Sequence, residues 1–306
     1  MIAFIFPGQG SQYAGMGKDL VDNFPVARQL FEEANDALGF DLASLCYNGP
    51  EDDLKLTANT QPAILTASVA ALRVLETETG LSPAFAAGHS LGEYSALVCA
   101  DALSFADAVV TVRQRGTFMQ EAVPVGTGSM AAILGLDLER LDAVCSDAAQ
   151  GEVVSPANYN SDGQVVIAGH TEAVARAVEL SKERGAKRAM LLPVSAPFHC
   201  SLMAPAGERL ADVLADIPVN EMALPIVTNV EATPNQEASR VRDLLVRQVC
   251  APVRWRETIA CMVGLGVERY VEVGPGKVLA GLVKRMAKGS TIQNVQNVAD
   301  VKALVG

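Results

Sequence analysis

Hydrophobic and polar positions along the chain alternate between two rhythms. Short apolar runs, such as residues 2–6 and 85–87, have the length and composition of buried strands. Between them lie longer runs with helical periodicity: the first helices extend to residue 38, and an amphipathic run over 61–79 ends at Gly80. Strands that alternate with helices in this way are typical of an α/β fold with a mostly parallel sheet.

From residue 124 the predicted elements become shorter. We expect strands at 130–134, 153–157, 164–168 and 189–194, and helices at 138–149 and 172–184. The resulting order, β-α-β-β-α-β, is that of a ferredoxin-like unit. The sequence therefore predicts a small ferredoxin-like domain at 126–195, inserted into a larger α/β domain formed by 1–125 and 196–306.

The returning chain continues the α/β pattern. We expect helices at 203–214 and 240–249, strands at 226–228 and 269–273, and a final basic helix after a glycine-rich turn at 274–276.

Charge and composition exclude several classes of protein. The chain has 24 Lys and Arg against 35 Asp and Glu, a net charge of −11, which argues against nucleic-acid binding as its main function. No uncharged run is long enough to span a bilayer, and the N-terminal apolar run is too short for a signal peptide. The six cysteines form no C-x-x-C pair. We therefore expect a soluble cytoplasmic protein with free thiols and no metal site.

Residues 88–92 read Gly-His-Ser-Leu-Gly and fit the G-x-S-x-G pattern. They lie between a predicted strand and a predicted helix, which is the context in which such a serine acts as a nucleophile. The sharp turn exposes the hydroxyl and points a helix N-terminus at developing negative charge, and glycine on either side leaves room for it. We therefore predict that Ser90 is a nucleophile, with a chance match in a glycine-rich α/β protein as the alternative.

A serine nucleophile needs a base, and the chain has three histidines. His89 adjoins the serine, so we expect its side chain to point away across the turn. His170 ends a strand of the small domain. His199 lies where the chain returns to the large domain, and domain junctions favour pockets. His199 is therefore the candidate base, and a purely structural histidine is the alternative.

The loop at residues 6–12 and the side chain of Arg115 can each be interpreted in two ways. Residues 6–12 follow the first strand at its carboxyl end, where open α/β sheets collect ligands, but they fit neither the dinucleotide fingerprint nor the Walker pattern. A backbone N–H of this loop could complete an oxyanion hole with that of Leu91, or the loop could be a turn without a ligand. Arg115 lies in an apolar helical stretch, and spacing alone favours a solvated helix face.

Five short segments of the sequence, taken together, indicate a family. They are residues 8–12 (Gly-Gln-Gly-Ser-Gln), 88–93 (Gly-His-Ser-Leu-Gly-Glu), 113–116 (Arg-Gln-Arg-Gly), 198–200 (Phe-His-Cys) and 272–276 (Glu-Val-Gly-Pro-Gly). In this order and spacing the chain resembles the malonyl-CoA:acyl carrier protein transacylase family over nearly its whole length. A general esterase would be expected to share only the serine motif. The resemblance implies a hydrolase-like α/β domain with a ferredoxin-like insertion and the site in the cleft between them.

The resemblance also implies roles for individual residues. Ser90 would be the nucleophile and His199 its base, with the backbone N–H groups of Gln9 and Leu91 as the oxyanion hole. Arg115 would bind the substrate carboxylate, because its planar guanidinium can form two parallel charge-assisted hydrogen bonds, which lysine cannot.

Three more residues follow from the same resemblance. The backbone of Gln248 would orient the histidine. Asn160 would face the cleft from the small domain. Phe198 corresponds to the bulky residue that, in related polyketide acyltransferases, accompanies malonyl rather than methyl-branched units.

The implied reaction is transfer of malonyl from malonyl-CoA to the phosphopantetheine thiol of acyl carrier protein, for fatty acid biosynthesis, through a malonyl-serine ester and without a cofactor. Both partners are anionic, so a chain of charge −11 needs local positive patches to bind them. We predict that one or both of two basic clusters flank the cleft, although solvated helix ends are equally consistent. The clusters are Lys182, Lys187 and Arg188, and Lys277, Lys284, Arg285 and Lys288.

Other functions fit parts of this pattern. A serine esterase or thioesterase would use the same Ser90 and His199, with water in place of the carrier thiol. A polyketide-type loading acyltransferase would share the chemistry and differ in acyl group and carrier. A non-catalytic carrier-binding scaffold would not need Ser90, His199 and Arg115 together. We expect the protein to be a monomer.

Overall fold

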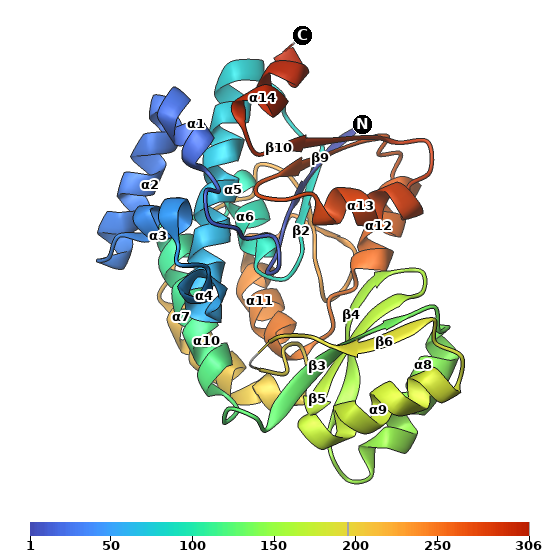
Figure 1. Ribbon diagram of the computed structural model, residues 1–306. Helices are drawn as coiled ribbons and strands as arrows, with labels where there is room; N and C mark the ends of the chain where they lie inside the picture. The colour runs from blue at the N-terminus through green and yellow to red at the C-terminus, as the bar shows by residue number, and fades with distance from the viewer. Residues whose placement is uncertain (195, 306) are drawn as a thin grey trace.

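The computed structural model describes residues 1–194 and 196–305, in which two β-sheets are surrounded by helices (Figure 1). The larger sheet has the strand order β10-β9-β1-β2-β7-β8. Neighbouring strands are parallel except for β7 and β8, which confirms the predicted mostly parallel sheet. Its strands are β1 (Ile2–Phe6), β2 (Phe85–Gly88), β7 (Ile226–Val227), β8 (Pro234–Asn235), β9 (Arg269–Val273) and β10 (Thr291–Val295).

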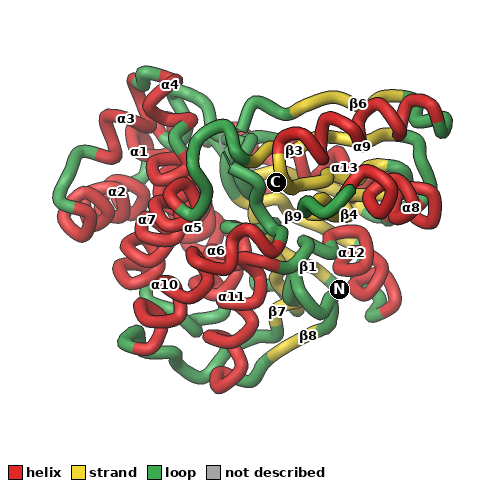
Figure 2. The backbone as a smooth tube through the Cα atoms, turned by 90° about the horizontal axis from the view of Figure 1, so that it is seen from below, coloured by secondary structure: helices red, strands yellow, loops and turns green. Residues whose placement is uncertain are grey.

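Alternate residues of the central strands pack on opposite faces of this sheet. In β1, Phe4 and Phe6 belong to one hydrophobic cluster and Ala3 and Ile5 to another, as expected for a strand with a two-residue period. Figure 2 shows most helices on one side of the sheet and α12 and α13 on the other. The first face is covered by α2 (Pro25–Leu38), α5 (Thr57–Thr79), α6 (Gly92–Cys99), α7 (Phe105–Glu121), α10 (Ala204–Ala215) and α11 (Val241–Cys250), and the second by α12 (Trp255–Gly264) and α13 (Val278–Met286).

The long helix α5 differs from the amphipathic helix predicted for 61–79. It begins earlier, at Thr57, and almost every side chain between Thr60 and Leu75 is buried. These side chains are buried because α5 lies among other helices, and α2, α6 and α7 all contact it. Its predicted end is correct: Gly80 caps the helix with a φ of 63°, a left-handed conformation that suits glycine.

The smaller sheet is antiparallel and has the order β4-β5-β3-β6. Together with its helices it gives the predicted ferredoxin-like sequence of elements. The elements are β3 (Gly128–Leu134), α8 (Leu138–Ala149), β4 (Val154–Ser161), β5 (Gln164–His170), α9 (Thr171–Glu183) and β6 (Arg188–Leu191). The fold class is thereby confirmed, while the exact domain boundaries remain a prediction.

The small sheet packs on both of its faces. Ala131 and Ile133 of β3 belong to a cluster with α8 and α9, whereas Met130 belongs to the large cluster of the main sheet. Backbone hydrogen bonds also join the two parts, because Tyr159 N–H donates to the carbonyl of Val253 and Val253 N–H donates to that of Ala157, each at 2.9 Å. Strand β4 of the small sheet is therefore attached to the segment between α11 and α12.

The remaining elements are short helices and 3-10 turns. The helices α1 (Lys18–Asn23), α3 (Leu42–Asn48) and α4 (Glu51–Lys55) accompany α2, and 3-10 turns occupy Ser201–Met203 and Ala238–Arg240. The chain does not end on the basic helix α13, as predicted, because β10 and α14 (Val298–Val305) follow it. The prediction missed β10 because its residues are mixed, with Gln293 and Asn294 at its centre. Among the described helices, none is both long and apolar enough to cross a membrane.

Candidate active site

Ser90 lies on a sharp turn between β2 and α6, and its φ of 53° is in the left-handed region. The flanking glycines are required by close packing. A Cβ on Gly88 would lie 1.9 Å from backbone atoms of Gly92, and a Cβ on Gly92 would lie 2.3 Å from the carbonyl oxygen of Phe6. The backbone of the turn itself therefore leaves no room for a side chain at Gly88, and strand β1 leaves none at Gly92. The turn presents Ser90 at the carboxyl end of the sheet, as the motif predicts.

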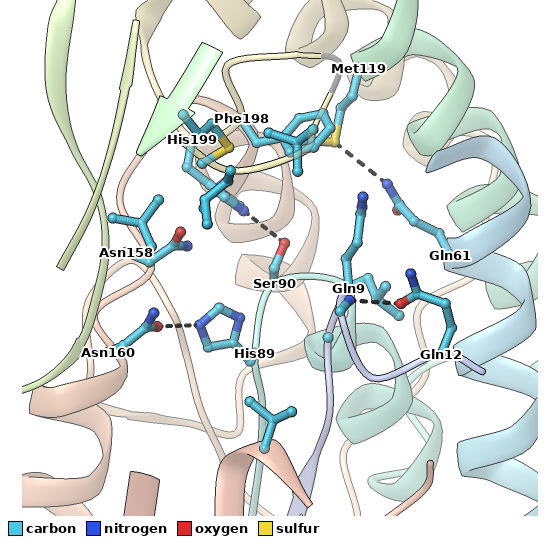
Figure 3. A pocket seen from close by; sticks show the side chains of 18 of the residues that line it. Gln9, Gln12, Gln61, His89, Ser90, Met119, Asn158, Asn160, Phe198 and His199 are labelled. Atoms are coloured by element: carbon cyan, nitrogen blue, oxygen red, sulfur yellow. Dashed lines mark hydrogen bonds between the residues drawn. The ribbon is translucent and has the colours of Figure 1, made fainter. Parts of the chain in front are cut away.

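His199 is within hydrogen-bond distance of Ser90, with 2.7 Å between Nε2 and Oγ (Figure 3). Its Nδ1 lies 2.8 Å from the backbone carbonyl of Gln248. A carbonyl can only accept, so Nδ1 carries the proton of the neutral ring and Nε2 is left free to accept from the serine hydroxyl. Burial and the nearby charge of Arg115 lower the pKa of His199 to about 3, so the imidazole is neutral at pH 7.

Arg115 is buried, with 1% of its surface exposed, so the solvated helix face that spacing favoured is wrong. Its guanidinium donates to Gln61 Oε1 at 2.7 Å, to Gln248 Oε1 at 2.8 Å and to Ser90 Oγ at 3.2 Å. Neutral oxygens thus hold the cation beside Ser90, and they leave its buried Nε–H without an acceptor among the described residues.

These groups line a cavity of about 560 Å³ between the two sheets. The loop 8–12 forms one side, and the N–H groups of Gln9 and Leu91 have no hydrogen-bond acceptor within 1–194 and 196–305. Phe198 and Met119 form an apolar side close to Ser90 (Figure 3). The arrangement combines a serine, a neutral base, free N–H donors and a buried cation, and so it suits attack on an acyl group that carries a carboxylate.

His89 does not point to solvent. Its ring points away from the Ser90 hydroxyl, and its Nε2 lies 2.8 Å from Oδ1 of Asn160, on β4 of the small sheet (Figure 3). Asn160 faces the cavity, as the resemblance implied, although this bond occupies its oxygen. The other histidine, His170, ends β5, and its Nδ1 accepts from the N–H of Val153, away from the cavity.

Comparison with known proteins agrees with this geometry. Residues 3–306 match the family model described as acyl transferase domain. A malonyl CoA-acyl carrier protein transacylase of Escherichia coli is 55% identical over 284 residues, which cover 93% of this chain and 92% of that protein. The chain belongs to the malonyl-CoA:acyl carrier protein transacylase family.

Solved structures of this transacylase family have the same fold. An acyl carrier protein S-malonyltransferase of Vibrio cholerae is 51% identical, with a TM-score of 0.97 and 99% of each chain covered. A malonyl-transacylase solved in complex with a type II polyketide synthase acyl-carrier protein is 50% identical, with a TM-score of 0.97 and coverage of 99% of this chain and 98% of the other.

The two basic clusters of this transacylase lie in different places. All seven residues are exposed. The cluster of Lys277, Lys284, Arg285 and Lys288 is on and beside α13, whose Val278, Leu279 and Leu282 line the cavity, and Arg285 donates to Gln164 at its edge, 3.2 Å away. Lys182, Lys187 and Arg188 do not line this cavity; Lys187 borders a separate shallow hollow, and Lys182 pairs with Glu179.

Sequence reasoning missed two residues that support the transacylase site. Glu93 and Asn229 are buried beneath Ser90, and Asn229 Oδ1 accepts from the N–H of Ser90 at 2.7 Å. Glu93 was part of the quoted motif, three residues after the serine, but that spacing alone gave it no role. Asn229 follows β7 at the carboxyl end of the sheet, which is the signal that could have indicated it. No group of three or more His, Cys, Asp and Glu that could hold a metal occurs among the described residues.

The close approach of β1 to the serine turn predicts an effect on stability. Gly92→Ala places a methyl group 2.3 Å from the carbonyl oxygen of Phe6, so we expect the free energy of unfolding to fall by about 2 kcal/mol in urea titrations. Gly281→Ala is the matched control, because a Cβ on this helical glycine meets nothing within 4 Å, and it should stabilise by about 0.5–1 kcal/mol. Equal stability of wild type and Gly92→Ala would contradict the packing account.

Proposed function

We propose that this protein transfers a malonyl group from malonyl-CoA to the phosphopantetheine thiol of an acyl carrier protein in fatty acid biosynthesis. The observation that carries the proposal is that one hydroxyl, Ser90 Oγ, lies 2.7 Å from the neutral base His199 and 3.2 Å from the buried cation Arg115. A plain serine hydrolase needs the base but not the cation. The names of the relatives support the same substrates.

In the first half-reaction Ser90 attacks the thioester carbonyl of malonyl-CoA while its proton passes to Nε2 of His199. The negative charge that develops on the carbonyl oxygen is stabilised by the free N–H groups of Gln9 and Leu91, and the carbonyl of Gln248 keeps the imidazolium oriented through Nδ1. Coenzyme A then leaves as its thiol, taking the proton from His199, and Ser90 carries the malonyl ester.

In the second half-reaction the carrier's phosphopantetheine thiol takes the place of coenzyme A. His199 accepts the thiol proton, the sulfur attacks the ester carbonyl, and Ser90 Oγ leaves with that proton. The product is malonyl thioester on the carrier, and the enzyme returns to its starting state. No cofactor is required, and malonyl-CoA is a substrate.

The substrate carboxylate also changes the electrostatics of the base. The charge of Arg115 contributes to the low pKa of His199. When the malonyl carboxylate pairs with Arg115, it offsets that charge, and the imidazolium that forms during attack becomes less unfavourable. Recognition of the carboxylate is thereby coupled to activation of the nucleophile. Phe198 and Met119 line the cavity as bulky apolar side chains, and we propose that they favour malonyl over branched units.

We also propose domain boundaries, an oligomeric state and a compartment for this protein. We take residues 126–195 as the inserted domain, with 1–125 and 196–306 as the hydrolase-like domain, which is supported by the two sheets that enclose the cavity. We take the enzyme to be a cytoplasmic monomer. The six free cysteines fit a reducing compartment.

A polyketide carrier is a second candidate partner, since one structural relative was solved with such a carrier.

The covalent intermediate gives the main test. Intact-mass measurement after brief mixing with malonyl-CoA should show a malonyl adduct on wild type and none on Ser90→Ala, and added carrier protein should discharge it. Carrier that becomes malonylated supports transfer. Free malonate without carrier malonylation would replace the proposal with a thioesterase, and the absence of any adduct would remove the nucleophile.

Arg115→Lys tests how the carboxylate is recognised. Lysine retains a positive charge but lacks the planar fork, so we expect kcat/KM for malonyl-CoA to fall about 100-fold, the equivalent of one or two charged hydrogen bonds. Acetyl-CoA has no carboxylate, and its slow reaction should change little. An unchanged preference for malonyl-CoA over acetyl-CoA would contradict the role of Arg115.

Charge reversal tests where the carrier docks. The cluster on α13 adjoins the cavity, so the double variant Lys284→Glu with Arg285→Glu should raise KM for the carrier about tenfold or more, while malonylation of Ser90 stays at the wild-type rate. The double variant Lys182→Glu with Arg188→Glu is the matched control. A raised carrier KM in the control alone would move the docking surface to β6 and the end of α9.

A further inference from the structure

Glu93 is a buried carboxylate for which the acyl-transfer mechanism has no step. It lies in the first turn of α6, three residues after Ser90, and 1% of its surface is exposed. Its Oε2 accepts two hydrogen bonds, from Nε2 of Gln248 at 2.7 Å and from the N–H of Asn229 at 3.1 Å. No salt bridge to Glu93 occurs among the described residues. An ionised carboxylate without a direct cation in such a place costs free energy.

The amide of Gln248 connects Glu93 to Arg115. Its NH₂ group faces the carboxylate, and its Oε1 accepts from the guanidinium at 2.8 Å. The amide dipole thus has its positive end at an anion and its negative end at a cation. Each charge holds the dipole in the orientation that suits the other, because an ionised carboxylate only accepts and a guanidinium only donates.

The same two partners of Glu93 hold the reacting serine. Gln248 Nε2 also donates to the backbone carbonyl of Ser90 at 3.0 Å, and Asn229 Oδ1 accepts from the N–H of Ser90 at 2.7 Å. The backbone carbonyl of Gln248 orients His199. Through two neighbours, Glu93 therefore reaches the nucleophile, its base and the cation beside it.

We propose that Glu93 is a positioning residue for acylation: its negative charge, acting through the Gln248 amide, keeps Arg115 and Ser90 in the geometry that accepts a carboxylated acyl group. The inference rests on the proposed function, because it assigns Glu93 to the support of that site. Glu93 touches no reacting atom, and it acts through the residues that do.

The surroundings of Glu93 determine the pH range in which this charge is present. Burial raises the pKa of Glu93 from 4.5 to about 7, although the hydrogen bonds from Gln248 and Asn229 and the charge of Arg115 oppose the rise. Arg115, on α7, is the charged group that faces it. Its neighbour Tyr94 on α6 has a pKa raised by burial and stays neutral, and the residues that face it from α11 and from the loop after β7 are the uncharged Gln248 and Asn229.

The rate of acylation and the stability of the fold should both depend on pH. Glu93 is ionised above about pH 7 and protonated below it, so the rate of Ser90 malonylation should fall as pH is lowered from 8.5 to 6. In the free enzyme burial and Arg115 hold the pKa of His199 at about 3, and with substrate bound the pH profile of Glu93→Gln separates the titration of Glu93 from that of the base. The effect on stability has the opposite sign. The folded-state pKa lies above the unfolded value, so ionisation destabilises the fold, and stability should rise as pH falls through 7 toward 4.5.

Glu93→Gln is the informative variant. One glutamine oxygen can accept from both Gln248 and Asn229, so these hydrogen bonds survive while the charge is removed and an NH₂ group replaces the second oxygen. We expect the single-turnover rate of malonylation, measured by quenched intact mass at saturating malonyl-CoA, to be about tenfold below wild type at pH 8.5. The rate should not vary between pH 6 and 8.5. The melting temperature at pH 8.5 should equal or exceed that of wild type, a result that a merely structural role would not give.

Glu272→Gln is the matched control. Glu272 is also fully buried, but it belongs to β9, and its carboxylate accepts from the backbone N–H groups of Leu279 and Ala280 and from the side chain of Asn294. This variant should retain the wild-type fall in rate below pH 7. A Glu93→Gln enzyme with the wild-type rate and pH profile would overturn the inference, as would a loss of activity accompanied by a lower melting temperature. If wild type itself forms no malonyl adduct, the proposed function fails instead.

Discussion

The buried charge of Arg115 is the constraint to which the rest of the site responds. A guanidinium with almost no exposed surface must find acceptors inside the protein, and here they are the side-chain oxygens of Gln61 and Gln248 and the hydroxyl of Ser90. Burial and this same charge lower the pKa of His199 and keep it neutral. Because these acceptors are uncharged, the cation has no charged partner at short range, and in the proposed function a carboxylate on the substrate would supply one.

The fold provides the rigidity that this arrangement needs. Three separate segments of the large domain place Ser90, Arg115 and Gln248 within hydrogen-bond distance of one another, and each belongs to a well-packed element or the turn before it. The small sheet closes the cavity from the other side, where Asn160 contacts His89. Backbone bonds through Val253 attach the small sheet to the segment between α11 and α12. The acyl group is thereby held between two preformed surfaces, which favours a positioned thiol over water.

Local patterns in the sequence predicted the parts of this site that depend on neighbouring residues. The serine turn needs glycine at fixed positions, so the motif at 88–92 identified it, and the alternation of elements predicted both sheets. Contacts between distant segments were not predictable in the same way. Arg115 is held by Gln61 of α5 and Gln248 of α11, which lie 54 and 133 positions away along the chain. The residues next to Arg115 in the sequence had instead suggested an exposed side chain. Glu93 and Asn229 acquire a role only when β7 and α11 are placed under Ser90.

A crystal structure of the enzyme trapped as its Ser90 malonyl ester would show directly what Arg115 binds. We predict that the malonyl carboxylate pairs with the guanidinium of Arg115, while the ester carbonyl oxygen points at the N–H groups of Gln9 and Leu91. A malonyl carboxylate that projects into solvent or contacts another cation, with Arg115 still bound only to Gln61 and Gln248, would contradict this prediction.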